Sequence, residues 1–180
     1  SVNYCPEDGA PLHADPYAGK VLLGQFQLLE VCGEGAMGTV YRAWQKTTER
    51  HVAVKILRRQ LAGDDRVIKR FHREAKAAAR LSHPNIINVH LVGATEEGLP
   101  FIVMEFLGGK TLEAVVREKG PLSETRAIRI ASQIASALSE AHDQGVIHRD
   151  LKPANVCLLE TRDAADVVKV LDFGIAKILS

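Results

Sequence analysis

The hydrophobic pattern of this chain changes its period at about Glu105, and this change constrains the fold most. Before it, branched and aromatic residues alternate over short stretches, which is typical of strands. The expected strands cover residues 26–33, 39–45, 51–58, 86–93 and 100–105. A helix is expected at about 65–81, because apolar residues recur there at helical spacing.

After Glu105 the pattern is mostly helical, with two short strands expected at about 156–159 and 167–171. Two helices are predicted, each with a Thr or Ser cap and a closing glycine: Thr111 with Gly120, and Ser123 with Gly145. The longer helix carries an apolar stripe that has to be buried against another element. A strand-rich half followed by a helical half indicates an α+β fold in two lobes.

The composition is that of an ordinary soluble protein. The chain has 180 residues, of which 46% are hydrophobic, and a net charge of +1. This near-neutral balance argues against a protein that binds nucleic acid or a membrane surface. We see no apolar run long enough to span a membrane. The three scattered cysteines predict reduced thiols and a cytoplasmic location.

Residues 1–25 contain three prolines and three glycines, which is typical of a leader or linker. Within them, "YCPEDG" (4–9) resembles the closing knuckle of a zinc-ribbon module. A structural zinc site needs four ligands, usually rich in cysteine, and Cys5 alone cannot supply them. A linker remnant is therefore the favoured interpretation, with a zinc-ribbon remnant as the alternative.

The segment "GEGAMGTV" (33–40) places Gly33, Gly35 and Gly38 at G-x-G-x-x-G spacing. The same spacing opens dinucleotide-binding folds, but there the third glycine enters a helix. Here "TVYRAW" follows, and these residues prefer a strand. A glycine hairpin between two strands lets backbone amides approach phosphate oxygens, whereas a plain turn is the alternative.

The strand "VAVK" (52–55) places Ala53 and Lys55 on one face. A lysine on a central strand is costly to bury unless an anion meets it, and the small Ala53 leaves room for a flat ring. We therefore expect a nucleotide across this strand, with Lys55 on its phosphates. Glu74 is the candidate carboxylate for holding Lys55; a weak surface pair with Arg70 is its alternative role.

The loop "HRDLKPAN" (148–155) gathers three polar residues that suit phosphoryl transfer to a hydroxyl. Asp150 can accept the hydroxyl proton, and Lys152 can meet the developing charge. Asn155 can supply one oxygen ligand to magnesium, which usually also takes a carboxylate. The strand predicted at 167–171 delivers that carboxylate, Asp172, and Gly174 lets the backbone turn away after it.

These motifs together resemble the protein kinases, in particular the eukaryotic-like Ser/Thr kinases of bacteria. The matching segments, which span about residues 26–179, are "GEGAMGTVY", "VAVKIL", "RFHREAKAAARLSHPNII", "FIVMEFLGGKTL", "HRDLKPANV" and "VKVLDFGIAK". The resemblance implies an ATP site between two lobes and Mg²⁺ as the metal. It implies that protein Ser or Thr hydroxyls are the acceptors, with the protein itself as a first substrate.

The resemblance also implies individual roles. Val40, Ala53 and Cys157 would enclose the adenine, with Met104 as gatekeeper. Glu105 and Leu107 would offer hinge backbone hydrogen bonds, and Arg149 would meet a phosphate on the activation segment. His148 and Phe173 would pack as structural residues.

The resemblance divides the chain into a leader (1–25), a complete small lobe (26–105) and a partial large lobe (106–180). The turn 160–166 is longer than is usual and is expected to be a harmless surface hairpin. We expect a fragment cut inside the activation segment and inactive by itself. The alternatives are a non-catalytic module that binds nucleotide or protein, and a small-molecule phosphotransferase of related fold.

Overall fold

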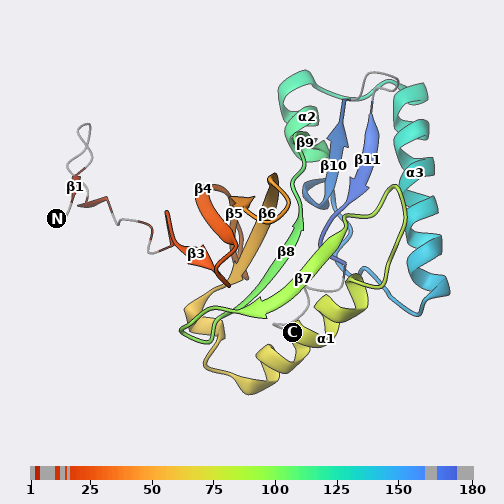
Figure 1. Cartoon of the computed structure of the whole chain (residues 1–180). Coiled ribbons are helices and arrows are strands. Elements are labelled where there is room, and N and C mark those ends of the chain that lie inside the picture. Colours follow the sequence, from red (N-terminus) through yellow and green to blue (C-terminus); the bar gives the residue numbers. More distant parts are fainter. Residues whose placement is uncertain (1–2, 5–10, 13–14, 16, 161–165, 174–180) are drawn as a thin grey trace.

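The computed structural model describes residues 3–4, 11–12, 15, 17–160 and 166–173 (Figure 1). Within these residues two sheets and three α-helices form two lobes, as the sequence predicted. A separate pair, β1 (Asn3–Tyr4) and β2 (Pro11–Leu12), is antiparallel. Cys5, on which the zinc-ribbon comparison depends, lies outside the described residues.

The small lobe is an antiparallel sheet in the order β3-β4-β5-β6-β8-β7. Its strands are β3 (Val21–Leu22), β4 (Phe26–Glu34), β5 (Gly38–Gln45), β6 (Arg50–Leu57), β7 (Val89–Ala94) and β8 (Pro100–Glu105). A short 3₁₀ turn, η1 (Arg59–Leu61), leads from β6 towards the helix α1 (Asp65–Ala78). Figure 1 shows α1 running along the sheet beside β7.

Helix α1 forms where the apolar spacing predicted it. Asp64 caps its first turn by accepting a hydrogen bond from Arg66 N at 2.8 Å. Val67, Phe71 and Ala75 are buried together with β6 and β8 side chains, including Leu57 and Ile102. The helix ends at Ala78, three residues before the predicted end. Burial of this face attaches α1 to the strand that carries Lys55.

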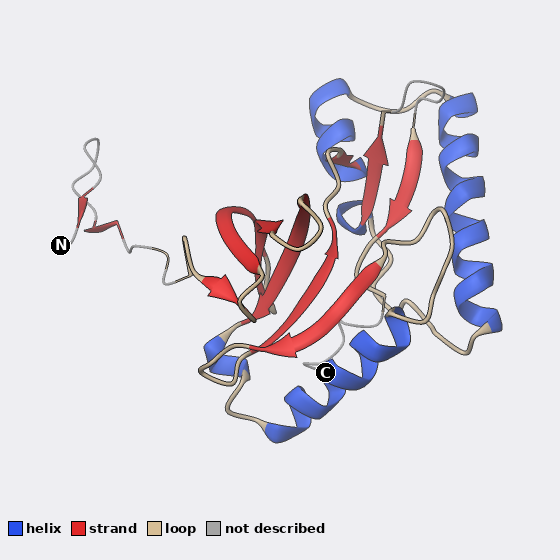
Figure 2. Ribbon diagram, viewed as in Figure 1, coloured by secondary structure: helices blue, strands red, loops and turns tan. Residues whose placement is uncertain are grey.

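The large lobe is built around a short sheet in the order β11-β10-β9 (Figure 2). Its elements are β9 (Lys110–Thr111), α2 (Leu112–Lys119), α3 (Glu124–Asp143), η2 (Pro153–Asn155), β10 (Val156–Leu159) and β11 (Val167–Val170). Helix α2 packs on β9 and β10, whereas α3 runs along β11. The two predicted caps are confirmed: Thr111 Oγ1 accepts from Ala114 N, and Ser123 Oγ from Arg126 N.

The apolar stripe predicted for α3 is buried in part against an element of this chain. Ile130, Ala137 and Ala141 are buried in one core cluster with Val168 and Val170 of β11. The short sheet therefore covers this face of α3. In contrast, Ile128 on another face of the helix is 61% exposed.

The predicted leader extends into the folded lobe. Tyr17 is buried in the core of the small lobe, and its hydroxyl donates a 2.7 Å hydrogen bond to Glu97. Tyr41 of β5 donates to Asp15 at 2.8 Å, and β3 pairs with the start of β4. The folded part of the small lobe thus begins about ten residues before the predicted boundary at residue 26. A linker composition concealed this, because Tyr17 and Leu22 are the only described residues of the predicted leader that are buried in this core.

Candidate active site

A cavity of about 560 Å³ lies between the glycine hairpin of the small lobe and the polar loop 148–155. It collects nine of the residues predicted for the site: Gly33, Gly35, Gly38, Val40, Lys55, Asp150, Lys152, Asn155 and Asp172. The residues come from both lobes and from four separate stretches of the sequence. Three more lining residues, Glu34, Ala36 and Met37, belong to the glycine hairpin, and the sequence did not reveal the other four: Cys32, Thr111, Ala154 and Leu171.

The glycine hairpin joins β4 to β5, as the strand-forming residues after Gly38 predicted. Gly35 N donates to Gly38 O at 3.0 Å, which closes the turn. A Cβ on Gly38 would lie 2.2 Å from the backbone oxygen of Ile56, so no larger residue fits there. Met37, at the tip, is buried with Val67 and Phe71. The hairpin is therefore held close to β6, and its residues line the cavity.

Lys55 lies on the central strand β6, paired with Val40 on one side and Ile102 on the other. Only 9% of the residue is exposed. Its Nζ donates to both carboxylate oxygens of Asp172, at 2.7 and 2.8 Å. A buried cation thus meets an acidic partner 117 residues away, which brings the two lobes together at this point. The predicted contact between Lys55 and Glu74 stays a prediction, since the structure does not describe the side chain of Glu74.

Asp172 follows β11 with a left-handed φ of 54°. Its neighbour Leu171 is fixed on both backbone groups: its N donates to Asn155 O at 2.9 Å, and its O contacts His148 Nε2 at 2.7 Å. Because Asp150 N donates to His148 Nδ1, the proton of the neutral imidazole belongs on Nε2, where it is donated to Leu171. The His148 ring lies 4.8 Å from that of the buried Phe173. The predicted structural roles of these two rings fit this packing.

The loop side chains form one polar group. Asn155 Nδ2 donates to the backbone O and to Oδ2 of Asp150, at 2.8 and 3.1 Å. Lys152 Nζ lies 2.9 Å from the same Oδ2. The hydrogen bond from Lys152 is the main reason why the pKa of Asp150 lies below its ordinary value. Asp150 is therefore a carboxylate at neutral pH, oriented by an amide and an ammonium.

The site has the oxygen ligands that a hard divalent cation requires. Asn155 uses its amide nitrogen on Asp150, which leaves the carbonyl Oδ1 for a metal, and Asp172 contributes a carboxylate in the same cavity. Magnesium is held by few protein oxygens, so these two ligands suffice. Among the described residues, no cluster of three or more His, Cys, Asp or Glu side chains offers a different metal site.

Of the residues predicted around the adenine, Val40 alone lines this cavity. Ala53 and Met104 are buried and directly opposite each other on β6 and β8. Burial also raises the pKa of the Cys157 thiol. Leu107 packs against the same core cluster as Ala53.

The backbone N and the carboxylate of Glu105 both form hydrogen bonds within the protein. Its backbone N donates to Asn88 O at 3.0 Å, so its carbonyl is the backbone group left for a hinge hydrogen bond. Its carboxylate accepts from Asn88 N and from Lys169 Nζ, both at 2.7 Å. The sequence offered no signal for this ion pair, because its partners are 64 residues apart.

The sequence of this chain is similar to those of known proteins. A family model described as the protein kinase domain matches residues 26–180. The chain belongs to the protein kinase family. This kinase chain is 49% identical over 164 residues to the Ser/Thr-protein kinase pkn3 of Myxococcus xanthus, covering 91% of the chain and 30% of that protein. It is 43% identical to the Ser/Thr-protein kinase PrkC of Bacillus subtilis, covering 90% of the chain and 24% of that protein.

Solved kinase domains have the same fold. The crystal structure of the Mycobacterium tuberculosis PknI kinase domain superposes with a TM-score of 0.77 at 34% identity, over 88% of this chain and 63% of that one. A structure of Rad53 in complex with AMP-PNP gives a TM-score of 0.73 at 32% identity, over 87% of this chain and 40% of that one. The kinase chain thus spans about a quarter to a third of the curated relatives it matches. Among the described residues, no helix is long and apolar enough to cross a membrane.

Proposed function

We propose that the protein containing this chain transfers the γ-phosphoryl group of ATP to Ser or Thr hydroxyls of protein substrates. The observation that carries the proposal is one cavity that gathers the glycine hairpin, Lys55, Asp150, Asn155 and Asp172. Each of these groups suits one requirement of phosphoryl transfer, which is catalysed mainly by positioning and electrostatic stabilisation.

Within this proposal the small lobe binds the phosphates. Backbone amides of the hairpin approach the phosphate oxygens, because its glycines carry no side chains that would block the approach. Lys55 supplies a buried positive charge that is already oriented by its strand and by Asp172. Asn155 and Asp172 would hold Mg²⁺, which neutralises negative charge on the phosphates when bound.

The large lobe acts on the acceptor. Asp150 orients the attacking hydroxyl and takes up its proton. Its low pKa keeps it ionised, which favours the orienting role in the ground state. Lys152, 53% exposed, can move from Asp150 to the transferred phosphoryl group when a substrate enters. The Ser/Thr specificity rests on Lys152 in the motif and on the Ser/Thr kinases among the relatives.

The experiment is to measure binding of Mg-ATP by calorimetry and transfer of radiolabelled phosphate to a general protein acceptor, using the full-length protein. Lys55→Met should weaken nucleotide binding and reduce transfer by at least ~100-fold, since a misplaced phosphate loses the near-attack geometry. Lys20→Met is the matched control: Lys20 also makes an ion pair, with Glu97, but neither residue lines the cavity. Equal transfer by wild type and Lys55→Met would refute the assignment. Binding without any transfer in the wild type would favour the alternative, a non-catalytic nucleotide-binding module.

We also propose that residues 1–180 by themselves are not an active kinase. The supporting observation is the exposure of two apolar side chains at the polar loop 148–155: Ile147 is 57% and Leu151 is 44% exposed, on either side of Asp150. Uncovered aliphatic side chains favour association or local movement, and catalysis by positioning tolerates little of either. Turnover per mole should be at least ~100-fold lower for residues 1–180 than for the full-length protein. Comparable turnover of the two would contradict this proposal.

Self-phosphorylation and a cytoplasmic location remain proposals as well. The first is tested in the same assay by omitting the acceptor, and the second by fractionating cells that express the protein.

A further inference from the structure

Strand β11, which leads to Asp172, is an edge strand: in the order β11-β10-β9 only one side of it pairs with a described strand. Its inner edge carries the ladder with β10. Its outer edge would leave backbone donors and acceptors unpaired, and exposed strand edges of this kind are costly and liable to shift register. The outer edge of β11 is nevertheless satisfied, mostly by two side-chain amides.

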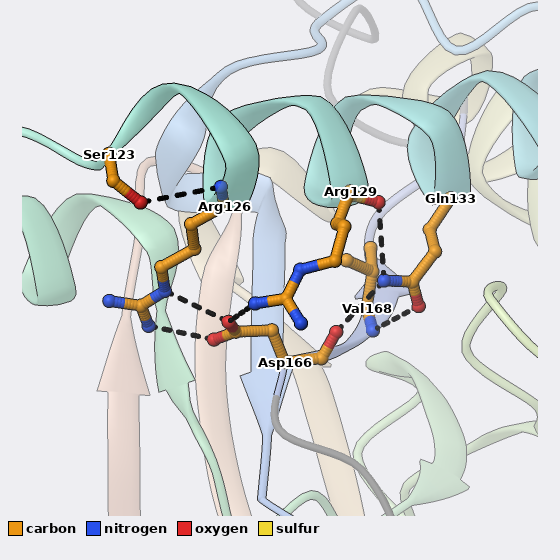
Figure 3. Close-up of polar contacts among 6 residues, drawn as sticks. All are labelled: Ser123, Arg126, Arg129, Gln133, Asp166 and Val168. Carbon is orange, nitrogen blue, oxygen red and sulfur yellow. Dashed lines mark hydrogen bonds and ion pairs between the residues drawn. The ribbon is translucent and has the colours of Figure 1, made fainter.

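Gln133 of α3 takes the place of a neighbouring strand. Its Nε2 donates to Asp166 O at 2.9 Å, and its Oε1 accepts from Val168 N at 3.0 Å. These two backbone groups lie on the same edge of the strand, two residues apart, so a single amide reproduces a pair of ladder bonds. These two hydrogen bonds attach α3 to β11 at one fixed position along the strand (Figure 3).

Asn85, in the segment between α1 and β7, continues the pattern. Its Nδ2 donates both to Gln133 Oε1 at 3.0 Å and to Val168 O at 2.9 Å. Its backbone O accepts from Val170 N at 2.8 Å. Ile87 N then donates to Val170 O at 3.0 Å. Every outer-edge group of β11 from Asp166 O to Val170 O therefore has a partner.

An ion pair fixes the start of the strand. Arg126 of α3 donates through Nε and Nη2 to the two carboxylate oxygens of Asp166, at 2.9 and 2.7 Å (Figure 3). Only 8% of the Asp166 side chain is exposed, and its φ is 60°, in the left-handed region. Such a backbone angle persists in a non-glycine residue only when the surroundings hold it. Arg129 lies 3.8 Å from the same carboxylate but is 59% exposed, so it contributes less.

The turn 160–166 was expected to be a harmless hairpin, and this expectation is wrong for Asp166. The residue ends the turn as a buried, paired carboxylate. Residues 161–165 lie outside the described residues.

We propose that Gln133, Asn85, Asp166 and Arg126 form an edge clamp that sets the register of β11 and thereby positions Asp172. The strand ends two residues before Asp172, and Leu171 between them is fixed by Asn155 and His148. A slip or tilt of β11 would therefore move Asp172 relative to Lys55 and Asn155. The residues of the clamp are positioning residues: they act through the strand and do not line the cavity. The catalytic consequence rests on the proposed function, whereas the structural one does not.

The test begins with hydrogen exchange at the Val168 amide in the full-length protein. Gln133→Met keeps the length and volume of the side chain but offers no acceptor. Hydrogen exchange at the Val168 amide should then become about tenfold faster, because the variant loses one net hydrogen bond. Gln133→Glu keeps an acceptor for Val168 and should restore most of the protection. Arg126→Gln should speed exchange across 167–170, whereas Arg129→Gln, the matched control on the same helix, should change it less than twofold.

The second readout is the Mg²⁺ concentration that half-saturates binding of a fluorescent ATP analogue. It should rise at least about threefold in Gln133→Met and Arg126→Gln and stay unchanged in Arg129→Gln, because only the first two displace Asp172. A purely structural role would lower the melting temperature without altering this titration, measured well below unfolding. Unchanged Val168 exchange in Gln133→Met, or equal effects of the two arginine variants, would overturn the clamp. Faster exchange with an unchanged Mg²⁺ titration would overturn its link to Asp172. Neither readout requires phosphoryl transfer, so a failure of the proposed function would be recognised separately.

Discussion

Replacing Gly38 with alanine should destabilise the small lobe through a single steric conflict. The new Cβ would lie 2.2 Å from Ile56 O and 3.0 Å from Ile56 C, both of them backbone atoms of the neighbouring strand. An ordinary contact needs roughly 1 Å more. The hairpin must therefore move away from β6, although the φ of Gly38 is not left-handed and alanine itself is tolerated by the backbone.

The cost can be worked out from what this movement breaks. The hydrogen bond from Arg58 N to Met37 O, at 2.9 Å, is next to the conflict and contributes about 1 kcal/mol. Met37 is buried against α1, and losing about half of its burial costs ~1–1.5 kcal/mol. The reduced entropy of the unfolded chain offsets ~0.4–1 kcal/mol of this. With residual strain of ~1–2 kcal/mol, the free energy of unfolding should fall by about 2–4 kcal/mol.

Differential scanning fluorimetry of the full-length protein measures this effect. A fall of about 2–4 kcal/mol corresponds to a melting temperature about 5–15 °C lower for a domain of this size. Gly35→Ala is the control, since the nearest atom to its Cβ, Gly38 O, is 4.0 Å away. That variant should keep its melting temperature within about 2 °C. Equal shifts in melting temperature for both variants would show that position 38 requires glycine for its backbone freedom and not because of the contact with Ile56.

Two further predictions concern stability. The Arg126 guanidinium holds the pKa of Asp166 below its ordinary value. This ion pair therefore stabilises the fold fully at pH values above the pKa of the unfolded carboxyl, ~3.9. The stabilisation is lost as the pH falls through the lower pKa of the folded state. In urea unfolding, the free energy of unfolding of Asp166→Asn should be ~2–4 kcal/mol lower than that of wild type at pH 7. This difference should shrink below pH ~4. A difference that stays constant down to about pH 2 would contradict the reasoning. Tyr17→Ala should lower the free energy of unfolding by ~2–4 kcal/mol and Tyr17→Phe by ~1 kcal/mol, because only the former removes the buried ring. A loss below ~0.5 kcal/mol in Tyr17→Ala would mean that residues 15–25 are a linker after all.

The sequence predicted the features that depend on local pattern. The residues after Gly38 prefer a strand, and β5 begins there, which separates this hairpin from a dinucleotide fold. Both helix caps, at Thr111 and Ser123, follow from side chains that satisfy the first amides of a helix. The order of the motifs along the chain predicted that Lys55, Asp150 and Asp172 meet in one site, and all three line the same cavity.

The features that sequence could not reveal depend on contacts between distant segments. The strand expected at 86–93 begins only at Val89, because the residues before it bond instead to β11, through Ile87 N and Val170 O. Tyr17 is buried although its surroundings resemble a linker. Gln133 left one weak signal, an amide three residues after Ile130 and four before Ala137 in an otherwise apolar stripe. Only the position of β11 explains why an amide is needed there.

The most direct test of the kinase assignment is transfer of the γ-phosphoryl group by the full-length protein, followed by identification of the phosphorylated residues by mass spectrometry. Wild type should yield phosphoserine and phosphothreonine at a rate that depends on Mg²⁺. Asp150→Asn should lower the turnover number by at least ~100-fold while leaving the affinity for ATP within about threefold, because the lost interaction belongs to the transition state. Phosphotyrosine as the main product, or an Asp150→Asn variant as active as wild type, would contradict the account.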